Sequence, residues 1–263
     1  MDIGIVGVGV IGYACKQGFE KLGHKITCHD LIYNTKLQDL KNTDALFICV
    51  STPRNENGSC DLSGVESTVH NLKKMEYEGL VVIKSTVKPT TTERLIQETG
   101  LNISFVPEFL RERSATEDFI KNHDLLAIGT CSDHAYSTIK TIHGNLPKQH
   151  ARLLPTEAEI LKYYSNTINA MRVVFANSIY EVCDHVNADY NKIKEAFLKR
   201  GTINDLYLNI NENCRGYAGV CLPQDTGALN AFINELGLDL KIFEAIQTEN
   251  DKFKKTVFDG MRL

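Results

Sequence analysis

Three glycines near the start of the chain constrain its fold most strongly. Gly7, Gly9 and Gly12 form a GxGxxG pattern that follows an apolar strand candidate and opens a helical pattern. In such a turn the first glycine permits a tight bend, the second lets the backbone approach a pyrophosphate, and the third allows close packing of helix on strand. Asp30 ends the next strand candidate, where a carboxylate binds ribose hydroxyls and repels a 2′-phosphate. The pattern predicts a dinucleotide site that prefers NAD.

Short apolar runs alternate with helical patterns throughout the first half of the chain. This alternation predicts an α/β fold with a Rossmann-type parallel sheet and helices on both faces. Only about fifteen residues separate Asp30 from Ala45, which leaves little room for a full crossover helix. The strand candidates are residues 3–6, 25–29, 45–50, 80–83, 103–106 and 125–128.

The pattern changes after Pro147. Thr156 and Glu159 have the spacing of a capping box and predict the start of a long helix that runs to about His185. Further helices are predicted near residues 190–199, 224–236 and 240–261, so the second half is expected to be all-helical. We therefore predict two domains: an NAD-binding Rossmann domain over 1–150, and a helical central domain for dimerisation, with a cysteine loop, over 151–263.

Composition argues against several classes of protein. The formal net charge of −4 gives no electrostatic reason to expect nucleic acid as a partner. The sequence contains no run of 18 apolar residues, so no membrane span is predicted. The apolar start lacks the basic leader of a signal peptide. The eight cysteines include no CxxC pair, which argues against a zinc or thioredoxin-like site. We expect a cytoplasmic protein with reduced thiols and no bound metal.

Five motifs follow one another along the chain and carry a family resemblance. Together they resemble the UDP-glucose/GDP-mannose 6-dehydrogenase family, and most of all its UDP-glucose 6-dehydrogenases. The motifs are CVSTPRNENGSCDLSGV at 49–65, KSTVKPTTTERL at 84–95, PEFLRERSATEDF at 107–119, EILKYYSNTINAMRVVFANSI at 159–179 and GYAGVCLPQD at 216–225.

The resemblance implies two successive NAD-dependent oxidations of a nucleotide sugar, UDP-glucose to UDP-glucuronate, of the kind used in polysaccharide biosynthesis. A cysteine captures the aldehyde-level intermediate, which is oxidised to a thioester and hydrolysed. It also implies a homodimer built on the central helical region. The positions that match the family's catalytic residues are Cys221, Lys162, Asn166, Asp225, Glu108 and Thr86.

Matching positions also suggest the binding residues. For the cofactor they are Gly7, Gly9, Val10, Ile11, Gly12, Asp30, Thr52, Pro53, Ser85, Thr86 and Glu112. For the substrate they are Glu108, Phe109, Leu110, Arg111, Lys162, Asn166 and Gly219.

The residues themselves agree with this chemistry. Lys162 and Asn166 stand at i and i+4, so both project from one helical face. A lysine near an alcohol can stabilise a developing alkoxide or take its proton. Cys221 lies in a glycine-bearing segment where a thiol is expected to be accessible, and a nearby lysine or a helix N-terminus would favour its thiolate.

The chain departs from the family at several positions. Gln224 stands where the family has a lysine, and Asp205 stands near the position of an arginine that reaches a partner subunit's sugar, with Arg215 as a candidate substitute. The segment between the second and third strands is short. The family also has a third, C-terminal Rossmann-like domain that helps to hold the nucleotide, and the sequence reaches Leu263 without it.

Two other functions remain open at this point. The first is a 3-hydroxyacid or 6-phosphogluconate-type dehydrogenase, which also pairs a Rossmann domain with helices and uses a lysine and an asparagine but needs no cysteine. The second is a non-catalytic module that binds NAD or dimerises. Replacement of Cys221 distinguishes the enzyme alternatives, and NAD binding without turnover supports the module.

Overall fold

The computed structural model describes residues 1–55 and 57–254. These residues divide into two compact units. The first comprises residues 1–55 and 60–162, and the second comprises residues 57–59 and 163–254. The domain boundary between residues 150 and 151 stays a prediction.

Within the described residues, the first unit is built on a seven-stranded sheet of order β2-β1-β3-β4-β5-β6-β7. Neighbouring strands are parallel except β5 and β6, which meet in an antiparallel bridge between Phe105 and Gly129. The predicted Rossmann-type α/β fold is confirmed. The strands are β1 Asp2–Val6, β2 Lys25–His29, β3 Ala45–Ile48, β4 Leu80–Ile83, β5 Ile103–Phe105, β6 Leu125–Gly129 and β7 Gln149–Leu153.

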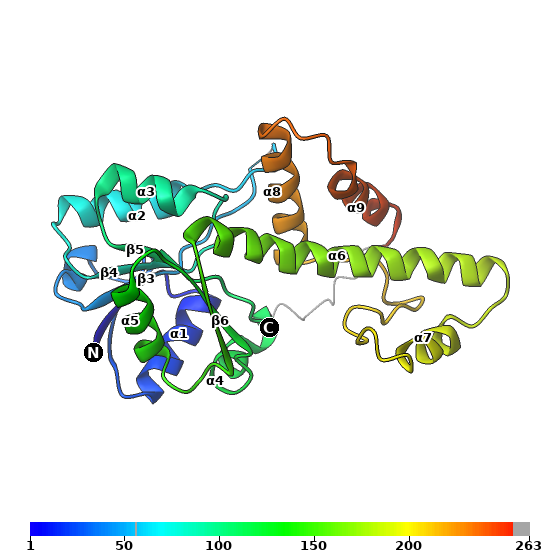
Figure 1. Cartoon of the computed structure of the whole chain (residues 1–263), viewed down its shortest axis with the longest axis horizontal. Coiled ribbons are helices and arrows are strands. Elements are labelled where there is room, and N and C mark those ends of the chain that lie inside the picture. The colour runs from blue at the N-terminus through cyan, green and yellow to red at the C-terminus, as the bar shows by residue number, and fades with distance from the viewer. Residues whose placement is uncertain (56, 255–263) are drawn as a thin grey trace. The chain divides into compact units, whose positions relative to one another are not determined.

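Helices cover both faces of this sheet (Figure 1). Helices α1 (Val10–Lys21), α4 (Ala115–Lys121) and α5 (Asp133–His143) pack on one face, and α2 (Ser63–Lys74) and α3 (Thr91–Thr99) pack on the other. Successive side chains of β3 therefore enter opposite cores. Phe47 joins the α1 side, while Leu46 and Ile48 join the α2 side. Burial on both faces explains why this strand is apolar without interruption.

Strand β7 corrects the expectation that everything after Pro147 is helical. Its sequence QHARL is largely polar, and the strand pairs with β6 alone at the edge of the sheet. His150 and Arg152 are exposed there. An edge strand packs few side chains against the core, so its sequence lacked the apolar run that identified the other strands.

The short link between β2 and β3 has the structure that its length predicts. It contains only a 3₁₀ turn, η1 (Leu37–Leu40), in place of a crossover helix. A second 3₁₀ turn, η2 (Glu112–Ser114), precedes α4.

The second unit is helical in its described residues. Helix α6 (Pro155–His185) starts in the first unit and continues through the second, followed by α7 (Tyr190–Leu198), α8 (Cys221–Glu235) and α9 (Lys241–Lys252). Val173, Tyr190 and Ile246 belong to its core. Helix α8 begins three residues before the predicted position, at Cys221 itself. Helix α9 ends at Lys252, and the predicted helix over residues 255–261 lies outside the described residues.

The start of α6 differs from the predicted capping box. The carboxylate of Glu157, rather than that of Glu159, accepts the backbone N–H at the start of the helix, from Leu154 at 2.7 Å. Glu159 instead binds backbone amides of another helix. Both acids lie in the first turn and a half, and only the tertiary structure distinguishes their partners.

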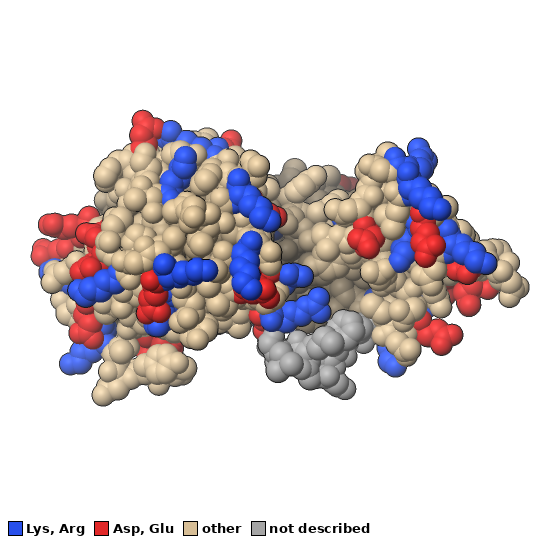
Figure 2. Space-filling view, turned by 90° about the horizontal axis from the view of Figure 1, so that it is seen from below, with Lys and Arg blue, Asp and Glu red and all other residues tan. Residues whose placement is uncertain are grey.

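The surface carries charges of both signs. Lys, Arg, Asp and Glu side chains are interspersed on the face seen in Figure 2. The eight cysteines are in the reduced state. Among the helices that the structure describes, none has the length and apolarity needed to cross a bilayer.

Candidate cofactor and catalytic sites

The glycine turn after β1 has the geometry that a pyrophosphate requires. Gly7 has φ +87°, and a Cβ there would lie 2.7 Å from the carbonyl oxygen of Cys49. A Cβ on Gly12 would lie only 1.9 Å from the carbonyl oxygen of Gly7. A Cβ on Gly9 would meet no atom within 4 Å. The first and third glycines are therefore required by the protein's own packing, and the second faces open space, where a phosphate can approach the start of α1.

Asp30 is held at the end of β2 in its charged form. The backbone N–H of Val8 donates to its Oδ2 at 2.6 Å, and that of Ile32 donates to its Oδ1 at 3.1 Å. The hydrogen bond from Val8 is the main reason that the pKa of Asp30 lies below its ordinary value. The carboxylate thus stabilises the glycine turn and leaves lone pairs for ribose hydroxyls.

A cleft of about 530 Å³ joins the glycine turn to Asp30. Gly7, Gly9 and Asp30 line it from one side, and Ser67 and Asn71 line it from α2. Its lining also includes Leu31 and Ile32, whose apolar side chains are 95% and 80% exposed. An open glycine, a charged carboxylate and exposed apolar side chains are together compatible with the adenosine diphosphate half of NAD.

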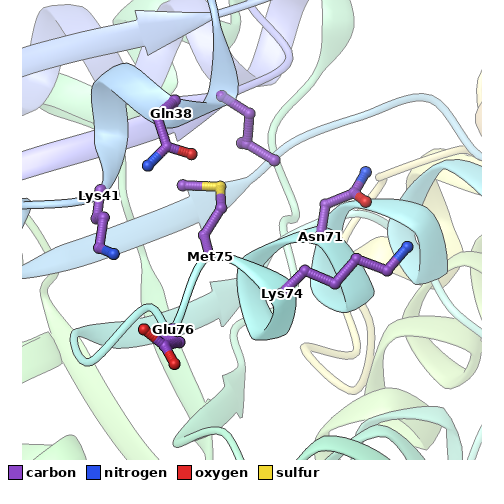
Figure 3. Close-up of a pocket in the computed structure, with 7 residues that line it drawn as sticks. Gln38, Lys41, Asn71, Lys74, Met75 and Glu76 are labelled. Atoms are coloured by element: carbon purple, nitrogen blue, oxygen red, sulfur yellow. The ribbon is translucent and has the colours of Figure 1, made fainter.

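A second hollow of about 430 Å³ lies beside this cleft (Figure 3). Leu37 and Asn71 line both hollows. Between η1 and the end of α2, the thioether of Met75 points toward Gln38. The two hollows are neighbours through their shared residues.

The loops after β3 and β4 are tied together by a residue that the sequence reasoning did not single out. The Cys60 thiol lies 3.5 Å from the carbonyl oxygen of Thr52 and 3.4 Å from that of Thr86, within reach as a donor to either. The Ser85 hydroxyl donates to the carbonyl of Val50 at 2.7 Å. Thr52, Ser85 and Thr86 thus lie at one edge of the sheet, while Pro53 is exposed. Sequence reasoning could have singled out Cys60, because it lies in a polar loop rather than in an apolar run like a core cysteine.

A buried ion pair lies just below this edge. Lys84 Nζ is 2.9 Å from Glu108 Oε2, and the two side chains are 1% and 8% exposed. Burial acts to raise the pKa of Glu108, but the charge of Lys84, with help from His123, holds it below its ordinary value. Both partners are therefore ionised near neutral pH. Glu108 Oε1 accepts the N–H of its neighbour Phe109 at 2.9 Å, so the carboxylate faces inward.

The PEFLRE segment also holds Lys162. The ammonium of Lys162 donates to the backbone carbonyl of Glu108 at 2.6 Å and lies 5.9 Å from the ring centre of Phe109. Leu110 packs partly buried against the first core. Arg111 pairs with Asp118 through two hydrogen bonds of 2.7 and 2.9 Å rather than with the exposed Glu112.

The second unit brings together three of the predicted catalytic residues. Cys221 is the first residue of α8 and is exposed. Asp225 lies one turn later on α8, is 2% exposed, and accepts a hydrogen bond from Asn166 Nδ2 at 2.5 Å. The i, i+4 spacing places Cys221 and Asp225 on one face of α8.

The segment that leads to Cys221 is held by α9. The Asn250 side chain accepts the backbone N–H of Tyr217 at 2.9 Å and donates to its carbonyl at 3.1 Å. A Cβ on Gly216 would lie 2.8 Å from the amide oxygen of Asn250, so this position requires glycine. Gly219 has φ +85° and meets open space. Asn250 was not predicted, because nothing local connects it with a segment more than thirty residues earlier.

Arg215 is engaged within its own unit. It donates to Asn177 Oδ1 at 2.8 Å, pairs with Glu181, and stacks on Tyr180 at 4.5 Å from the ring centre. Its guanidinium thus supports the loop before Cys221. Gln224 is half-buried on α8. Among the described residues, no cluster of three or more His, Cys, Asp or Glu side chains has the arrangement of a metal site.

Known proteins match both units. Residues 32–147 match the NAD binding domain of the UDP-glucose/GDP-mannose dehydrogenase family, and residues 156–252 match its central domain. The chain belongs to this family. It is an NAD-dependent nucleotide-sugar dehydrogenase.

Individual relatives agree with the assignment. The chain is 30% identical to the UDP-glucose 6-dehydrogenase of Rickettsia bellii, over 98% of its own length and 69% of that protein's. A solved UDP-glucose dehydrogenase of Pyrobaculum islandicum has 29% identity and a TM-score of 0.87, with 95% of this chain and 68% of that one covered. A 3-hydroxyisobutyrate dehydrogenase of Mycobacterium tuberculosis, at 10% identity, shares the fold with a TM-score of 0.78 over 95% of this chain and 92% of that one.

Substitution of two glycines separates folding from cofactor binding. Gly12→Ala should destabilise the protein by at least about 2 kcal/mol, because its methyl group collides with the Gly7 carbonyl. Gly9→Ala should leave the unfolding midpoint unchanged but weaken NAD binding about tenfold, because its methyl group projects into the path of the pyrophosphate. Thermal unfolding and calorimetric NAD titration measure the two effects. Equal NAD affinity in Gly9→Ala and the native protein would contradict this position for the phosphates.

Proposed function

We propose that the protein oxidises UDP-glucose to UDP-glucuronate with two NAD, through a covalent intermediate on Cys221. The observation that carries the proposal is the arrangement of an exposed thiol at the first residue of α8 and a buried Asp225–Asn166 pair one turn later. The names of relatives such as the Rickettsia bellii enzyme support UDP-glucose as the substrate.

The first unit would hold the cofactor. Gly9 and the first amides of α1, at Val10 and Ile11, would receive the pyrophosphate, and Asp30 would bind the adenosine ribose. Thr52, Ser85 and Thr86, at the carboxyl edge of the sheet, would line the nicotinamide end. When bound, NAD accepts a hydride from the carbon that is oxidised, once in each of the two oxidations.

Lys162 and Asn166 would act in the first oxidation. As the alcohol loses its hydride, it must also lose its hydroxyl proton, and negative charge develops on the oxygen. A lysine ammonium stabilises that oxygen, and an amide N–H supports it. Lys162 is already aimed by its hydrogen bond to the Glu108 carbonyl, and Asn166 by its hydrogen bond to Asp225. Little reorganisation is then needed when substrate binds.

Cys221 would make the second oxidation possible. Its thiolate adds to the aldehyde carbon, the carbonyl oxygen takes a proton, and a thiohemiacetal forms. Loss of a hydride and that proton yields a thioester, and water then cleaves the carbon–sulfur bond to release the acid and regenerate the thiol. The partial positive charge at the N-terminus of α8 favours a negative sulfur at its first residue.

We assign the activation of water to Asp225 rather than to Glu108. The carboxylate of Glu108 faces inward, toward Lys84 and the N–H of Phe109. This orientation suits Glu108 to hold the conformation of residues 108–111, which are predicted to bind the substrate. Asp225 lies one helical turn from Cys221, where a carboxylate can accept a proton from the attacking water.

Replacement of the cysteine tests the covalent mechanism. Cys221→Ala should reduce acid formation on the order of a thousandfold or more, with native folding and NAD affinity, because the aldehyde has no sulfur to carry the second oxidation. The measurement is NADH and UDP-glucuronate produced per UDP-glucose, at high nucleotide-sugar concentration. Cys131→Ala, at another exposed thiol, is the matched control.

Three results would overturn parts of this proposal. Native acid production by Cys221→Ala would exclude the covalent step and favour a hydroxyacid-type dehydrogenase. Turnover of UDP-N-acetylmannosamine or GDP-mannose in preference to UDP-glucose would retain the chemistry and change the substrate. NAD binding without turnover of any sugar nucleotide would indicate a binding module.

Asp30 should determine the choice between NAD and NADP. Because the carboxylate also accepts the Val8 N–H, Asp30→Asn is preferable to alanine, which would release the glycine turn. Loss of charge-assisted hydrogen bonds to ribose costs about 1.5–3 kcal/mol, which is about a 10- to 100-fold weaker NAD affinity. NADP affinity should fall less or rise. Calorimetry that shows NADP bound as tightly as NAD by the native protein would refute the assignment.

The second unit supports a homodimer. Helix α6 exposes Phe175, Val182 and Val186 at 64%, 59% and 61%, and these positions recur at helical spacing along one side. Helix α7 exposes Ile193 and Phe197. We infer that a second copy of the chain covers this surface, since apolar side chains spaced along a helix form a typical self-complementary interface.

Introduction of a charge on this surface should split the dimer. Burial of a phenylalanine side chain contributes about 1.5–3 kcal/mol. Phe175→Glu removes this contribution, so the dissociation constant of the dimer should rise about 10- to 100-fold. Light scattering at micromolar concentration measures the mass of each variant, with Lys121→Glu, a change of an exposed lysine on α4 of the first unit, as the charge control. A native monomer at these concentrations would contradict the interface.

A further inference from the structure

Glu159 is a completely buried carboxylate that the proposed reaction does not use. It lies on α6, and its exposed fraction is 0%. Its Oε2 accepts the backbone N–H of Thr90 at 2.6 Å, and its Oε1 accepts that of Thr92 at 2.8 Å. Both oxygens of one side chain thus bind two backbone donors of a different element.

Those two donors belong to the start of α3. The first amides of a helix have no partner within the helix, and Thr90, the residue before α3, makes no side-chain cap there. Glu159 supplies the missing acceptor from α6, and its negative charge also complements the positive end of the α3 dipole. The start of α6 does not need Glu159, since Glu157 accepts the Leu154 amide.

Thr90 shows how strongly this contact is required. Its φ is +77°, a left-handed conformation that a β-branched residue rarely adopts. Without a partner such as Glu159, the turn before α3 would relax from this conformation. The charge-assisted bond to Glu159 holds the Thr90 amide in place, so α6 and the turn before α3 are joined at one point.

Lys162 lies three residues after Glu159, almost one helical turn along α6. Its ammonium reaches the Glu108 carbonyl at 2.6 Å. Glu159, Lys162, Glu108 and Thr90 all belong to the first unit. We call the two hydrogen bonds from Thr90 and Thr92 to Glu159 the Glu159 anchor. Because the anchor sets the rotation of α6 and its position along its axis, it decides whether Lys162 reaches that carbonyl.

We propose that Glu159 is a positioning residue that fastens α6 to the N-terminus of α3 and thereby fixes the Lys162 ammonium. The functional part rests on the catalytic role proposed above for Lys162. The positional part does not, and can be measured on the protein without substrate.

The anchor depends on ionisation. Burial raises the pKa of Glu159 to about 7, the amides of Thr92 and Thr90 oppose the rise, and the Glu93 carboxylate on α3 adds to it. Because this pKa exceeds the ordinary 4.5, the stability contributed by the group is present below about pH 4.5 and is lost as pH rises through about 7. The hydrogen bonds from Thr90 and Thr92 have the opposite dependence, since protonation removes the charge and turns one acceptor oxygen into a weakly accepting hydroxyl. Positioning should thus improve as pH rises through about 7.

Glu159→Gln tests the proposal, because it resembles the protonated acid in shape. The full chain is treated briefly with acetic anhydride, and acetylation of each lysine is followed by mass spectrometry. At pH 8, Lys162 should be acetylated several times faster in Glu159→Gln than in the native protein, with the exposed lysines Lys192 and Lys241 unchanged as references. Amide exchange over residues 90–92 should also be faster. Glu157→Gln, an exposed acid on the same turn, is the matched control.

Thr90→Gly separates backbone strain from the anchor. It removes the left-handed threonine but keeps the N–H that donates to Glu159, so the unfolding midpoint should rise while Lys162 acetylation stays native. An unchanged Lys162 acetylation rate in Glu159→Gln would overturn the proposal. Loss of folding in that variant, shown by circular dichroism, would assign Glu159 a purely structural role and overturn it as well.

Turnover provides the separate test of function. With UDP-glucose and NAD, kcat of Glu159→Gln should fall about tenfold with little change in KM, because a small misplacement of a catalytic group lowers the rate more than binding. The rise of kcat near pH 7 should be absent in this variant. If the native protein has no turnover, the proposed function fails, while the acetylation result still decides whether Glu159 positions Lys162.

Discussion

The buried pair of Lys84 and Glu108 is the interaction on which the first unit's site depends. It joins the end of β4 to the segment after β5, and each charge is tolerated in the interior only because the other is there. Removal of either partner would leave an uncompensated buried charge, at a cost of about 3–5 kcal/mol. Because the pair fixes the Glu108 backbone, it also fixes the carbonyl that receives Lys162. A structural ion pair thus helps to determine where Lys162, the residue proposed to act in the first oxidation, can lie.

Elsewhere the molecule uses one device repeatedly: a polar side chain from one element satisfies backbone groups of another. Asp30 accepts the Val8 amide and holds the glycine turn. Glu159 accepts two amides at the start of α3. Asn250 binds both backbone groups of Tyr217 before the cysteine helix. Buried backbone groups must be paired, and irregular segments near a site cannot pair with themselves. These side chains therefore give loops the rigidity that helices and strands supply internally.

Much of the first unit followed from the sequence because its signals are local. Apolar runs identified six strands to within two residues at each end, and the glycine spacing identified the turn that follows β1. Strand β7 was missed since an edge strand needs few apolar residues. The capping box was assigned to the wrong acid because Glu157 and Glu159 differ in tertiary partners, not in local pattern.

By itself the sequence determined the sheet and its helical layers, the open second glycine, and the helical spacings that set Lys162 beside Asn166 and Cys221 beside Asp225. Each of these depends on residues within a few positions of one another, where backbone geometry alone dictates direction. Only the tertiary structure decided that Lys84 neutralises Glu108 and that Asn250 holds Tyr217. It also decided that the side chain of Glu159, on α6, accepts backbone amides at the start of α3. Those partners are more than twenty residues apart, and no local pattern shows which distant donor will meet a given acceptor once the chain is packed.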